Sequence, residues 1–534
     1  MTDSPASTHR QDVFPANFVF AAALVLLLGF LLRLWKASGT FLNPDEAMHF
    51  LAANKSSLAE AYRTGLGLAH PPLLILFLHV WKSLGTSELV LRLPSVIAGT
   101  IFCWLFFKWL VWTSNTFTAW IGFLLVSFLP SFIELSSEVR QYALLLCFLI
   151  AATYVFEGAL AAVSGGKMLF SFLFLYLAML THFSGILFAG TIGVYSLWRM
   201  ASAHFSRQVI AIWIAGQAGA LGLVVFLYRT QISNLRVSAA AQHMQVLLGT
   251  SYFHWGHDHL LQFIFARTFG VLQYTFGQLV VGDIAGVLFI AGLVVLLSEE
   301  RGQKEPGASP HQLGTFLLLP FTINCAAAIM DLYPYGGTRH SAFLMPFAIA
   351  GVSLGMTKLT RQRWPLALSA TLLILIVCQV FGVPHRPYMR REDQRSANMI
   401  HAIDAIRHQV SPADIIFVDF QTNFLLRFYF CPDVVPDGSP ASSFRTYSCG
   451  GYRVISTNSE TNILTVETFS QHWNEMVSTY SLKPGQTVWI FQAGWDIGLA
   501  QELQRKIPKL HDLERDFFGR NISLFKLSVG SFAM

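Results

Sequence analysis

An acidic pair, Asp45-Glu46, directly follows the first long apolar run of the chain. A carboxylate beside a membrane groove can accept a proton from a hydroxyl and so act as a general base. Arg140 and Arg339 also stand close to the ends of apolar runs. Arginine is a forked donor that matches phosphate oxygens and stays charged in any environment. These residue types suit a reaction in which a lipid-linked phosphate leaves and its charge must be stabilised.

Other ionisable residues stand near the ends of apolar runs, namely Glu138, His182 and the segment from Asp331 to His340. Ionisable groups near membrane depth are costly and are functional candidates by default. Any one of them alone reads equally well as an ordinary interfacial residue. The stronger reason to group them is that they all lie on one side of the membrane. The distribution of Lys and Arg in the short connections indicates this.

The elements that must position these residues are membrane helices. Of the residues, 54% are hydrophobic and only 12% are charged, and the mean hydropathy is +0.50. A soluble domain carries about twice that share of charge. Apolar runs near the roughly 20 residues needed to cross a bilayer predict about eleven spans. They cover residues 18–35, 91–111, 117–135, 142–163, 168–181, 184–199, 208–227, 283–298, 314–331, 340–358 and 364–383.

Basic residues predict the orientation of these spans. Short connections on one side carry Lys167, Arg199, Arg207, Arg301, Lys304, Lys358, Arg361 and Arg363. The excess of Lys and Arg marks that side as cytoplasmic. The N-terminus is then cytoplasmic in an inner-membrane, multi-pass protein, and every candidate residue above lies on the extracytoplasmic side.

The fold predicted is mostly α, with a helical membrane domain over 1–383 and a small extracytoplasmic α/β domain over 384–534. Residues 46–63 and 70–84 mix apolar and polar positions at helical spacing, which predicts helices along the membrane surface. The segment 263–281 looks similar. From residue 384 charge rises, and short apolar runs alternate with turn formers.

Charge and cysteine content leave two further points. The net charge of +6 comes without a basic stripe or nucleic-acid motif, so no nucleic-acid partner is expected. Cys431 and Cys449 lie in the polar C-terminal region, where an oxidising compartment would permit a disulfide, and two free thiols are the alternative.

Five motifs occur in an order that resembles one family. They are Asn43-Pro44-Asp45-Glu46-Ala47, the region from His70-Pro71-Pro72-Leu73 through Arg92, Glu138-Val139-Arg140-Gln141-Tyr142-Ala143-Leu144, Leu180-Thr181-His182-Phe183 and Arg339-His340. They resemble the C-type (GT-C) membrane glycosyltransferases, in the branch of the protein O-mannosyltransferases and the lipid A aminoarabinose and galacturonic acid transferases. The similarity runs in order from residue 18 to about 350 and is best in the first 200. Phe183 and His340 depart from the family, which carries tyrosine at both places.

The resemblance implies transfer of a sugar, usually with inversion, from a polyprenyl-phosphate donor to an acceptor outside the cytoplasmic membrane. Asp45 would be the catalytic base or the carboxylate that orients the acceptor. Glu46 would position a substrate, or would only cap a surface helix. The donor would be held by His70, Arg140, Tyr142, His182 and Arg339, while Arg92 would anchor a surface helix to lipid headgroups.

Several alternatives stay open. His254 through His259 holds three histidines and an aspartate, but not at a standard ligand spacing, so a metal site competes with a capping or acceptor-contacting loop. No cofactor is certain, and a divalent metal remains an option because some relatives bind one near the acidic motif. A transporter or flippase of lipid-linked sugars is the alternative function. Transporters carry midplane charges and repeated halves, neither of which occurs here. A binding module on a membrane anchor is weaker still.

Overall fold

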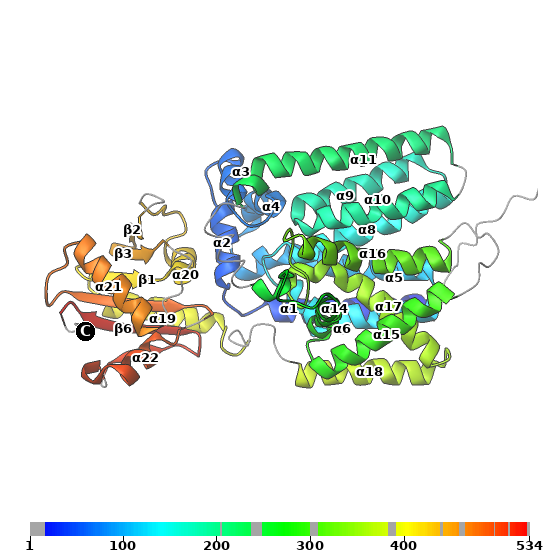
Figure 1. Ribbon diagram of the computed structural model, residues 1–534. Coiled ribbons are helices and arrows are strands. Elements are labelled where there is room, and N and C mark those ends of the chain that lie inside the picture. The colour runs from blue at the N-terminus through cyan, green and yellow to red at the C-terminus, as the bar shows by residue number, and fades with distance from the viewer. Residues whose placement is uncertain are drawn as a thin grey trace, which may run out of the picture.

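The computed structural model describes residues 16–202, 205–235, 248–298, 308–382, 391–437, 442–458, 465–495, 497–510 and 513–530. In these residues a bundle of long apolar helices meets a smaller domain built on a β-sheet (Figure 1). The predicted mostly-α membrane fold with a C-terminal α/β domain is confirmed. The bundle comprises α1 (Ala16–Ala37), α5 (Glu88–Thr113), α6 (Thr116–Phe128), α7 (Pro130–Leu135), α8 (Tyr142–Ala161), α9 (Gly165–Thr181), α10 (Ser184–Ala201), α11 (Arg207–Leu227), α15 (Leu279–Ser298), α16 (Pro310–Ile329), α17 (Met345–Leu359) and α18 (Trp364–Phe381).

Each predicted span coincides with a helix of this bundle, except 117–135, which the structure divides between α6 and α7. Within the described residues, 8 helices are long and apolar enough to cross a membrane, and α6 and α9 are shorter apolar helices beside them. Because lipid offers no hydrogen-bond partners, the backbone must satisfy itself in such helices. The chain is therefore a multi-pass membrane protein.

The span predicted over 117–135 is not one helix, because Pro130 breaks it. Leu129 adopts an extended conformation, α6 ends at Phe128, and α7 begins at Pro130. Proline has no N–H to donate and disfavours helix at the residue before it. The carbonyls of Val126 and Ser127 instead accept hydrogen bonds from the guanidinium of Arg33 on α1, each at 3.0 Å. An arginine within a membrane span thus donates hydrogen bonds to backbone carbonyls at the break in the helix.

Glycines allow α15 and α17 to pack closely. A Cβ at Gly292 would overlap the carbonyl oxygen of Gly351, and a Cβ at Gly355 would overlap that of Leu288. Small residues spaced four apart are the usual way for membrane helices to approach each other. α17 is the most buried of the candidate spans, and it follows directly on the short 3₁₀ helix η4 (Arg339–Leu344).

Short helices lie between the bundle and the sheet domain. They are α2 (Pro44–Ala53), α3 (Leu58–Leu66) and α4 (Leu73–Trp81), and α2 runs across the end of the bundle in Figure 1. The helices predicted over 46–63 and 70–84 are thus present. A further helix, α14 (Leu260–Phe276), accounts for the similar pattern at 263–281 and is seen end-on in Figure 1.

The C-terminal domain is a six-stranded sheet in the order β2-β3-β1-β4-β6-β5. Its strands are β1 (Ile415–Val418), β2 (Phe444–Cys449), β3 (Tyr452–Thr457), β4 (Thr487–Ala493), β5 (Arg515–Phe517) and β6 (Ile522–Ser528). The central strands β3, β1 and β4 are parallel, and the other pairings are antiparallel. The helices are α19 (Ser396–Gln409), α20 (Phe420–Phe430), α21 (Val466–Thr479) and α22 (Leu499–Lys506).

The two faces of this sheet have separate apolar cores. Ile415 and Phe417 of β1 pack with α21 and α22. Ile416 and Val418, which alternate with them, belong to a core that continues through α19 and α20 into α2 and α4. Alternation along a strand sends successive side chains to opposite faces. One face of the sheet therefore shares its core with the helices that cover the bundle.

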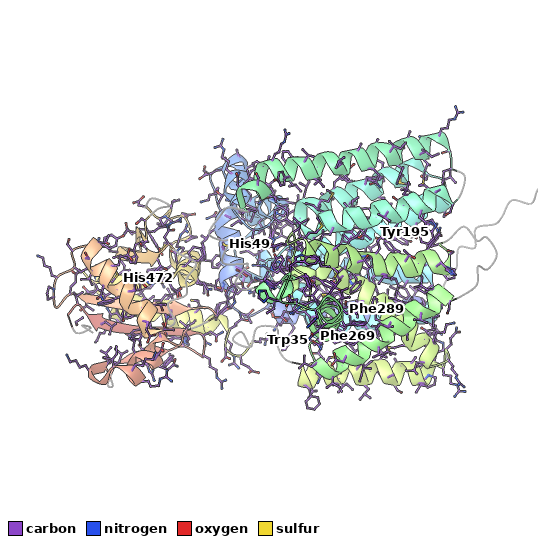
Figure 2. All side chains as sticks on the ribbon, in the orientation of Figure 1. Trp35, His49, Tyr195, Phe269, Phe289 and His472 are labelled. Carbon is purple, nitrogen blue, oxygen red and sulfur yellow. A yellow bond between two sulfur atoms is a disulfide. The ribbon has the colours of Figure 1, made fainter. Side chains whose placement is uncertain are left out.

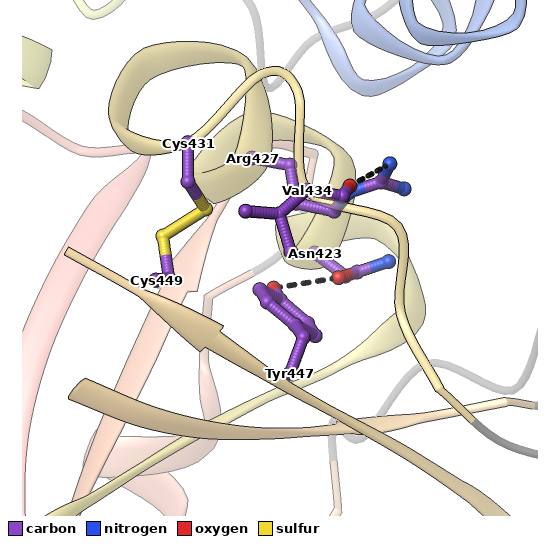
Figure 3. The surroundings of a disulfide bond; sticks show 6 residues. All are labelled: Asn423, Arg427, Cys431, Val434, Tyr447 and Cys449. Atoms are coloured by element: carbon purple, nitrogen blue, oxygen red, sulfur yellow. Dashed lines mark hydrogen bonds between the residues drawn. A yellow bond between two sulfur atoms is a disulfide. The ribbon is translucent and has the colours of Figure 1, made fainter. Parts of the chain in front are cut away.

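A disulfide links Cys431, just after α20, to Cys449 at the end of β2 (Figure 3). Nearby, the Tyr447 hydroxyl donates to the Asn423 side chain at 2.7 Å. Of the two alternatives left open by the sequence, the structure contains the disulfide. The four remaining cysteines are buried and free.

Candidate functional site

Asp45 sits in the first turn of α2, and local sequence fixes that turn. The Asn43 side chain accepts a hydrogen bond from the Glu46 amide at 3.0 Å, and the Glu46 carboxylate accepts one from the Asn43 amide at 2.8 Å. This is a capping box, with Pro44 at the first helical position, where its missing N–H costs nothing. The carboxylate of Asp45 is thereby held at the end of the helix where negative charge is favoured.

Two arginines from distant segments reach the same oxygen of Asp45. Oδ2 lies 2.6 Å from Nη1 of Arg140 and 3.0 Å from Nη2 of Arg339. Arg140 comes from the tight turn between α7 and α8, and Arg339 begins η4. Burial alone would raise the pKa of Asp45, but the two guanidinium charges lower it below its ordinary value. Asp45 is therefore an ionised carboxylate at neutral pH.

Aromatic rings surround this ion cluster. The His70 and His182 rings stack with centroids 4.9 Å apart, and Tyr142 lies 5.3 Å from His182. His49 is 6.3 Å from His70, and His340 is 6.3 Å from His182. Figure 2 labels His49 where the bundle meets the C-terminal domain, whereas Tyr195 lies well inside the bundle.

The imidazoles outside the spans are held neutral. Burial, followed by the charge of Arg140, lowers the pKa of His182 to about 3 and that of His49 to about 4. Burial, then the neighbouring His182, lowers the pKa of His70 well below its ordinary value. A neutral imidazole has one donor and one acceptor nitrogen. The Nδ1 of His49 donates to the carbonyl of Asp45 at 2.5 Å, which fixes one tautomer.

Several buried polar atoms at this cluster have no hydrogen-bond partner among the described residues. They are Nδ1 of His70, Nε of Arg140, the hydroxyl of Tyr142, Nε2 of His182 and Nη1 of Arg339. Buried polar groups in native proteins are nearly always paired, so each exception calls for an explanation. Five such atoms in one place indicate a site that a polar ligand completes.

Glu46 has a different role from its neighbour. Its two oxygens accept from Nε and Nη2 of Arg92, each at 2.7 Å. They also accept from the amides of Asn43 and Val139, each at 2.8 Å. Glu46 is fully buried, and a carboxylate offers about four acceptor positions. Its geometry matches the helix-capping alternative.

Arg92 corrects the expectation that it contacts lipid headgroups. It is only 3% exposed, and besides Glu46 it donates to the carbonyls of Ala37, Thr40 and Phe41 at 2.8–3.0 Å. It therefore holds the segment between α1 and α2 in place. From sequence alone, an arginine flanked by apolar residues suggests a headgroup anchor. Its buried partners lie elsewhere in the chain, so the local sequence does not reveal them.

A small cavity of about 30 Å³ lies beside this ion pair. Glu134 and Glu138 line it together with Lys36, Glu46 and Arg92. Burial, then the charge of Glu46, raises the pKa of Glu138 to about 7. The carboxyl group of Glu138 therefore titrates near neutrality.

Of the residues predicted for the site, the structure brings together Asp45, His70, Arg140, Tyr142, His182 and Arg339. Sequence reasoning missed His49, although its spacing of four from Asp45 puts both on one helix face. The histidine segment 254–259 forms an exposed turn in which His254 pairs with Asp258. Within the described part of the chain, no group of three or more His, Cys, Asp or Glu side chains is arranged to hold a metal ion.

The bundle of apolar helices with a small C-terminal sheet domain matches the fold of the GT-C membrane glycosyltransferases. Residues 69–228 match the family described as dolichyl-phosphate-mannose-protein mannosyltransferase. A comparison with curated proteins finds no match.

Three solved structures are similar to this chain to different extents. ArnT from Cupriavidus metallidurans, bound to undecaprenyl phosphate, is similar with a TM-score of 0.51 and 11% identity, over 96% of this chain and 98% of that one. The archaeal oligosaccharyltransferase AglB from Archaeoglobus fulgidus has a TM-score of 0.49 and 9% identity, over 89% and 70%. The S. cerevisiae Pmt1-Pmt2 complex bound to the sugar donor gives 0.33 and 18%, over 40% of this chain and only 33% of that one. The ArnT match shows the GT-C fold.

Proposed function

We propose that the protein transfers a sugar from a polyprenyl-phosphate donor to a hydroxyl of an acceptor on the extracytoplasmic side of the cytoplasmic membrane. One observation carries the proposal: a single oxygen of Asp45 is shared by Arg140 and Arg339. Each arginine also keeps a buried N–H that has no partner among the residues that the structure describes. A base and two phosphate-binding groups thus meet at one point at the end of the bundle.

In this reaction the acceptor oxygen attacks C1 of the sugar while Asp45 accepts the hydroxyl proton. The bond between C1 and the phosphate oxygen breaks, and polyprenyl phosphate leaves with one additional negative charge. Arg140 and Arg339 stabilise that charge through the N–H groups that the described part of the chain leaves unpaired. His70, Tyr142 and His182 line the same site. A single displacement of this kind inverts the configuration at C1.

The ends of the helices support an extracytoplasmic site. The connections around Lys167, Arg207 and Lys358 belong to helix ends opposite those that carry Arg140 and His182. Lys and Arg favour the cytoplasmic side. The carboxylate cluster and the C-terminal domain with its disulfide then face the oxidising side of the membrane. Glu46 acts here as a positioning residue for Asp45.

The test measures the donor in cells. Cells that lack the protein are expected to accumulate a polyprenyl-phosphate sugar, detected by mass spectrometry, and the wild-type chain should clear it. Asp45→Asn should leave it uncleared because the amide cannot take up the proton. Asp404→Asn, on the exposed side of α19, is the matched control and should clear it normally. Clearance by Asp45→Asn at the wild-type level would overturn the assignment.

A further inference from the structure

We infer that Asp45 competes with the lipid phosphate for Arg140 and Arg339, so that loss of the transferred proton from Asp45 expels polyprenyl phosphate after each turnover. The inference rests on the proposed function, because it assumes that both arginines bind the phosphate of the donor. It adds a step that the transfer reaction itself does not include, namely the release of the lipid product.

Asp45 is the counter-charge of both arginines. Its Oδ2 lies 2.6 Å from Nη1 of Arg140 and 3.0 Å from Nη2 of Arg339. Among the residues that the structure describes, no other carboxylate forms an ion pair with either arginine. Arg140 is only 2% exposed, and a buried guanidinium needs a partner of opposite charge because its desolvation is costly. A phosphate bound to the same two arginines would supply that partner in place of Asp45.

Two anions that share these arginines weaken each other. Nε of Arg140 and Nη1 of Arg339 have no partner in the described structure and can receive phosphate oxygens beside Asp45. Like charges in a buried site repel strongly because little water screens them. A bound phosphate therefore raises the proton affinity of Asp45. Because such linkage is reciprocal, ionised Asp45 lowers the affinity of the site for phosphate by the same factor.

The transfer reaction changes this balance twice. When Asp45 accepts the proton of the acceptor hydroxyl, it becomes neutral while the departing phosphate gains a negative charge, so the arginines hold the product strongly. When Asp45 then gives that proton to water, its carboxylate pairs with the arginines again and displaces the phosphate. The proton leaves as hydronium, polyprenyl phosphate returns to the membrane, and the pairing seen in the structure is restored.

Other ionisable groups also act on Asp45 and on a phosphate beside it. They are His49 on α2, Glu138 in the turn before α8 and His340 on η4. The carboxyl group of Glu138 interacts electrostatically with Asp45 and with both arginines, but it forms no ion pair with either arginine in the described part of the chain. All three groups are retained when Asp45 alone is substituted, so a comparison of variants isolates the contribution of Asp45.

The experiment measures the dissociation constant and the dissociation rate of bare polyprenyl phosphate from the full-length protein in lipid nanodiscs. At about pH 8, where Glu138 is mostly ionised, we expect Asp45→Asn to bind the lipid more tightly than the wild type. The gain should be about ten-fold or more, mostly in a slower dissociation rate. Asp45→Glu keeps the charge and should gain less than about three-fold. Asp404→Asn, on the exposed side of α19, is the matched control and should bind as the wild type does.

Two results would overturn the inference and leave the proposed function standing. One is binding by Asp45→Asn that is equal to or weaker than that of the wild type, and the other is an equal gain in Asp45→Glu. If Asp45→Asn unfolds without the lipid, it is purified as the complex, and a dissociation rate at or above the wild-type rate contradicts the inference. If bare polyprenyl phosphate binds neither the wild type nor any variant, the proposed function fails as well.

A double variant tests whether the competition acts through a shared arginine. In an Arg339→Ala background, Asp45→Asn should gain less affinity for bare polyprenyl phosphate than it gains in the wild type, because one of the two shared groups is missing. An equal gain in both backgrounds would contradict competition for Arg339.

Discussion

The hydroxyl of Tyr429 on α20 accepts a hydrogen bond from the amide of Leu42 at 2.7 Å. The same hydroxyl donates to Glu88, in the first turn of α5, at 3.1 Å. Leu42 directly precedes the residue that caps α2, and Gly494 at the end of β4 lies close to Pro44. The C-terminal domain therefore holds the backbone that presents Asp45.

Removing that hydroxyl should impair turnover more than donor binding. Tyr429→Phe keeps the ring but leaves the Leu42 amide unpaired, so Asp45 loses part of its alignment. We expect kcat for sugar transfer to fall about ten-fold or more, with the KM for the donor nearly unchanged. Tyr452→Phe removes a hydroxyl that donates to the Arg407 carbonyl at 3.4 Å, and this variant is the control. An unchanged kcat in Tyr429→Phe would show that the hydroxyl does not align the site.

Arg92→Ala should destabilise the fold. Its loss leaves the Glu46 carboxylate buried without a counter-charge, which typically costs about 3–5 kcal/mol. Thermal unfolding in detergent measures the effect. The double variant Arg92→Met with Glu46→Gln removes both charges and should lose less stability than Arg92→Ala. If Arg92→Ala melts at the wild-type temperature in detergent but at a lower temperature than the wild type in lipid, Arg92 binds lipid headgroups.

Glu138 should make stability depend on pH near neutrality. Burial, then the charge of Glu46, raises its pKa from the usual 4.5 to about 7. Between these values the folded protein binds the proton more tightly than the unfolded chain, so the free energy of unfolding falls as pH rises. Glu138→Gln should therefore show a smaller decrease in melting temperature between about pH 5 and about pH 8 than the wild type.

The matched control for that measurement is Glu475→Gln, an exposed position on α21. Its melting temperature should follow the wild type across the same pH range. An identical pH dependence for Glu138→Gln and the wild type would mean that the carboxyl group of Glu138 titrates at its ordinary pKa.

The disulfide should stabilise the C-terminal domain. It closes a loop with a sequence separation of 18, and cross-linking a loop of this length stabilises a fold by about 3 kcal/mol. Cys431→Ser with Cys449→Ser should lose about that much in denaturant titrations followed by tryptophan fluorescence. The wild type treated with a reductant should behave like the double variant. A wild-type protein insensitive to the reductant and equal to the double variant would show that the bond does not form.

Parts of the site could be predicted because their signals are local. The capping sequence around Asp45, the turn that carries Arg140 and the helix end at His182 are each encoded within a few residues. The sequence did not reveal that Glu46 and Arg92 pair with each other, because the contact joins residues 46 positions apart. Tyr429 gave no signal at all, because an aromatic residue on an amphipathic helix is ordinary. The span predicted over 117–135 did not foresee the break at Pro130, nor the hydrogen bonds that Arg33 makes there.

The sequence by itself determined the apolar spans, the placement of the ionisable groups at span ends and the change to an α/β domain, because hydropathy and periodicity depend only on neighbouring residues. Only the tertiary structure decided that Arg140 and Arg339 share one oxygen of Asp45, the latter across a separation of 294 residues. It also decided that four imidazoles gather beside them and that α20 supports α2. Such contacts arise from how helices pack against one another, and that packing is set by complementary surfaces distributed over the whole chain.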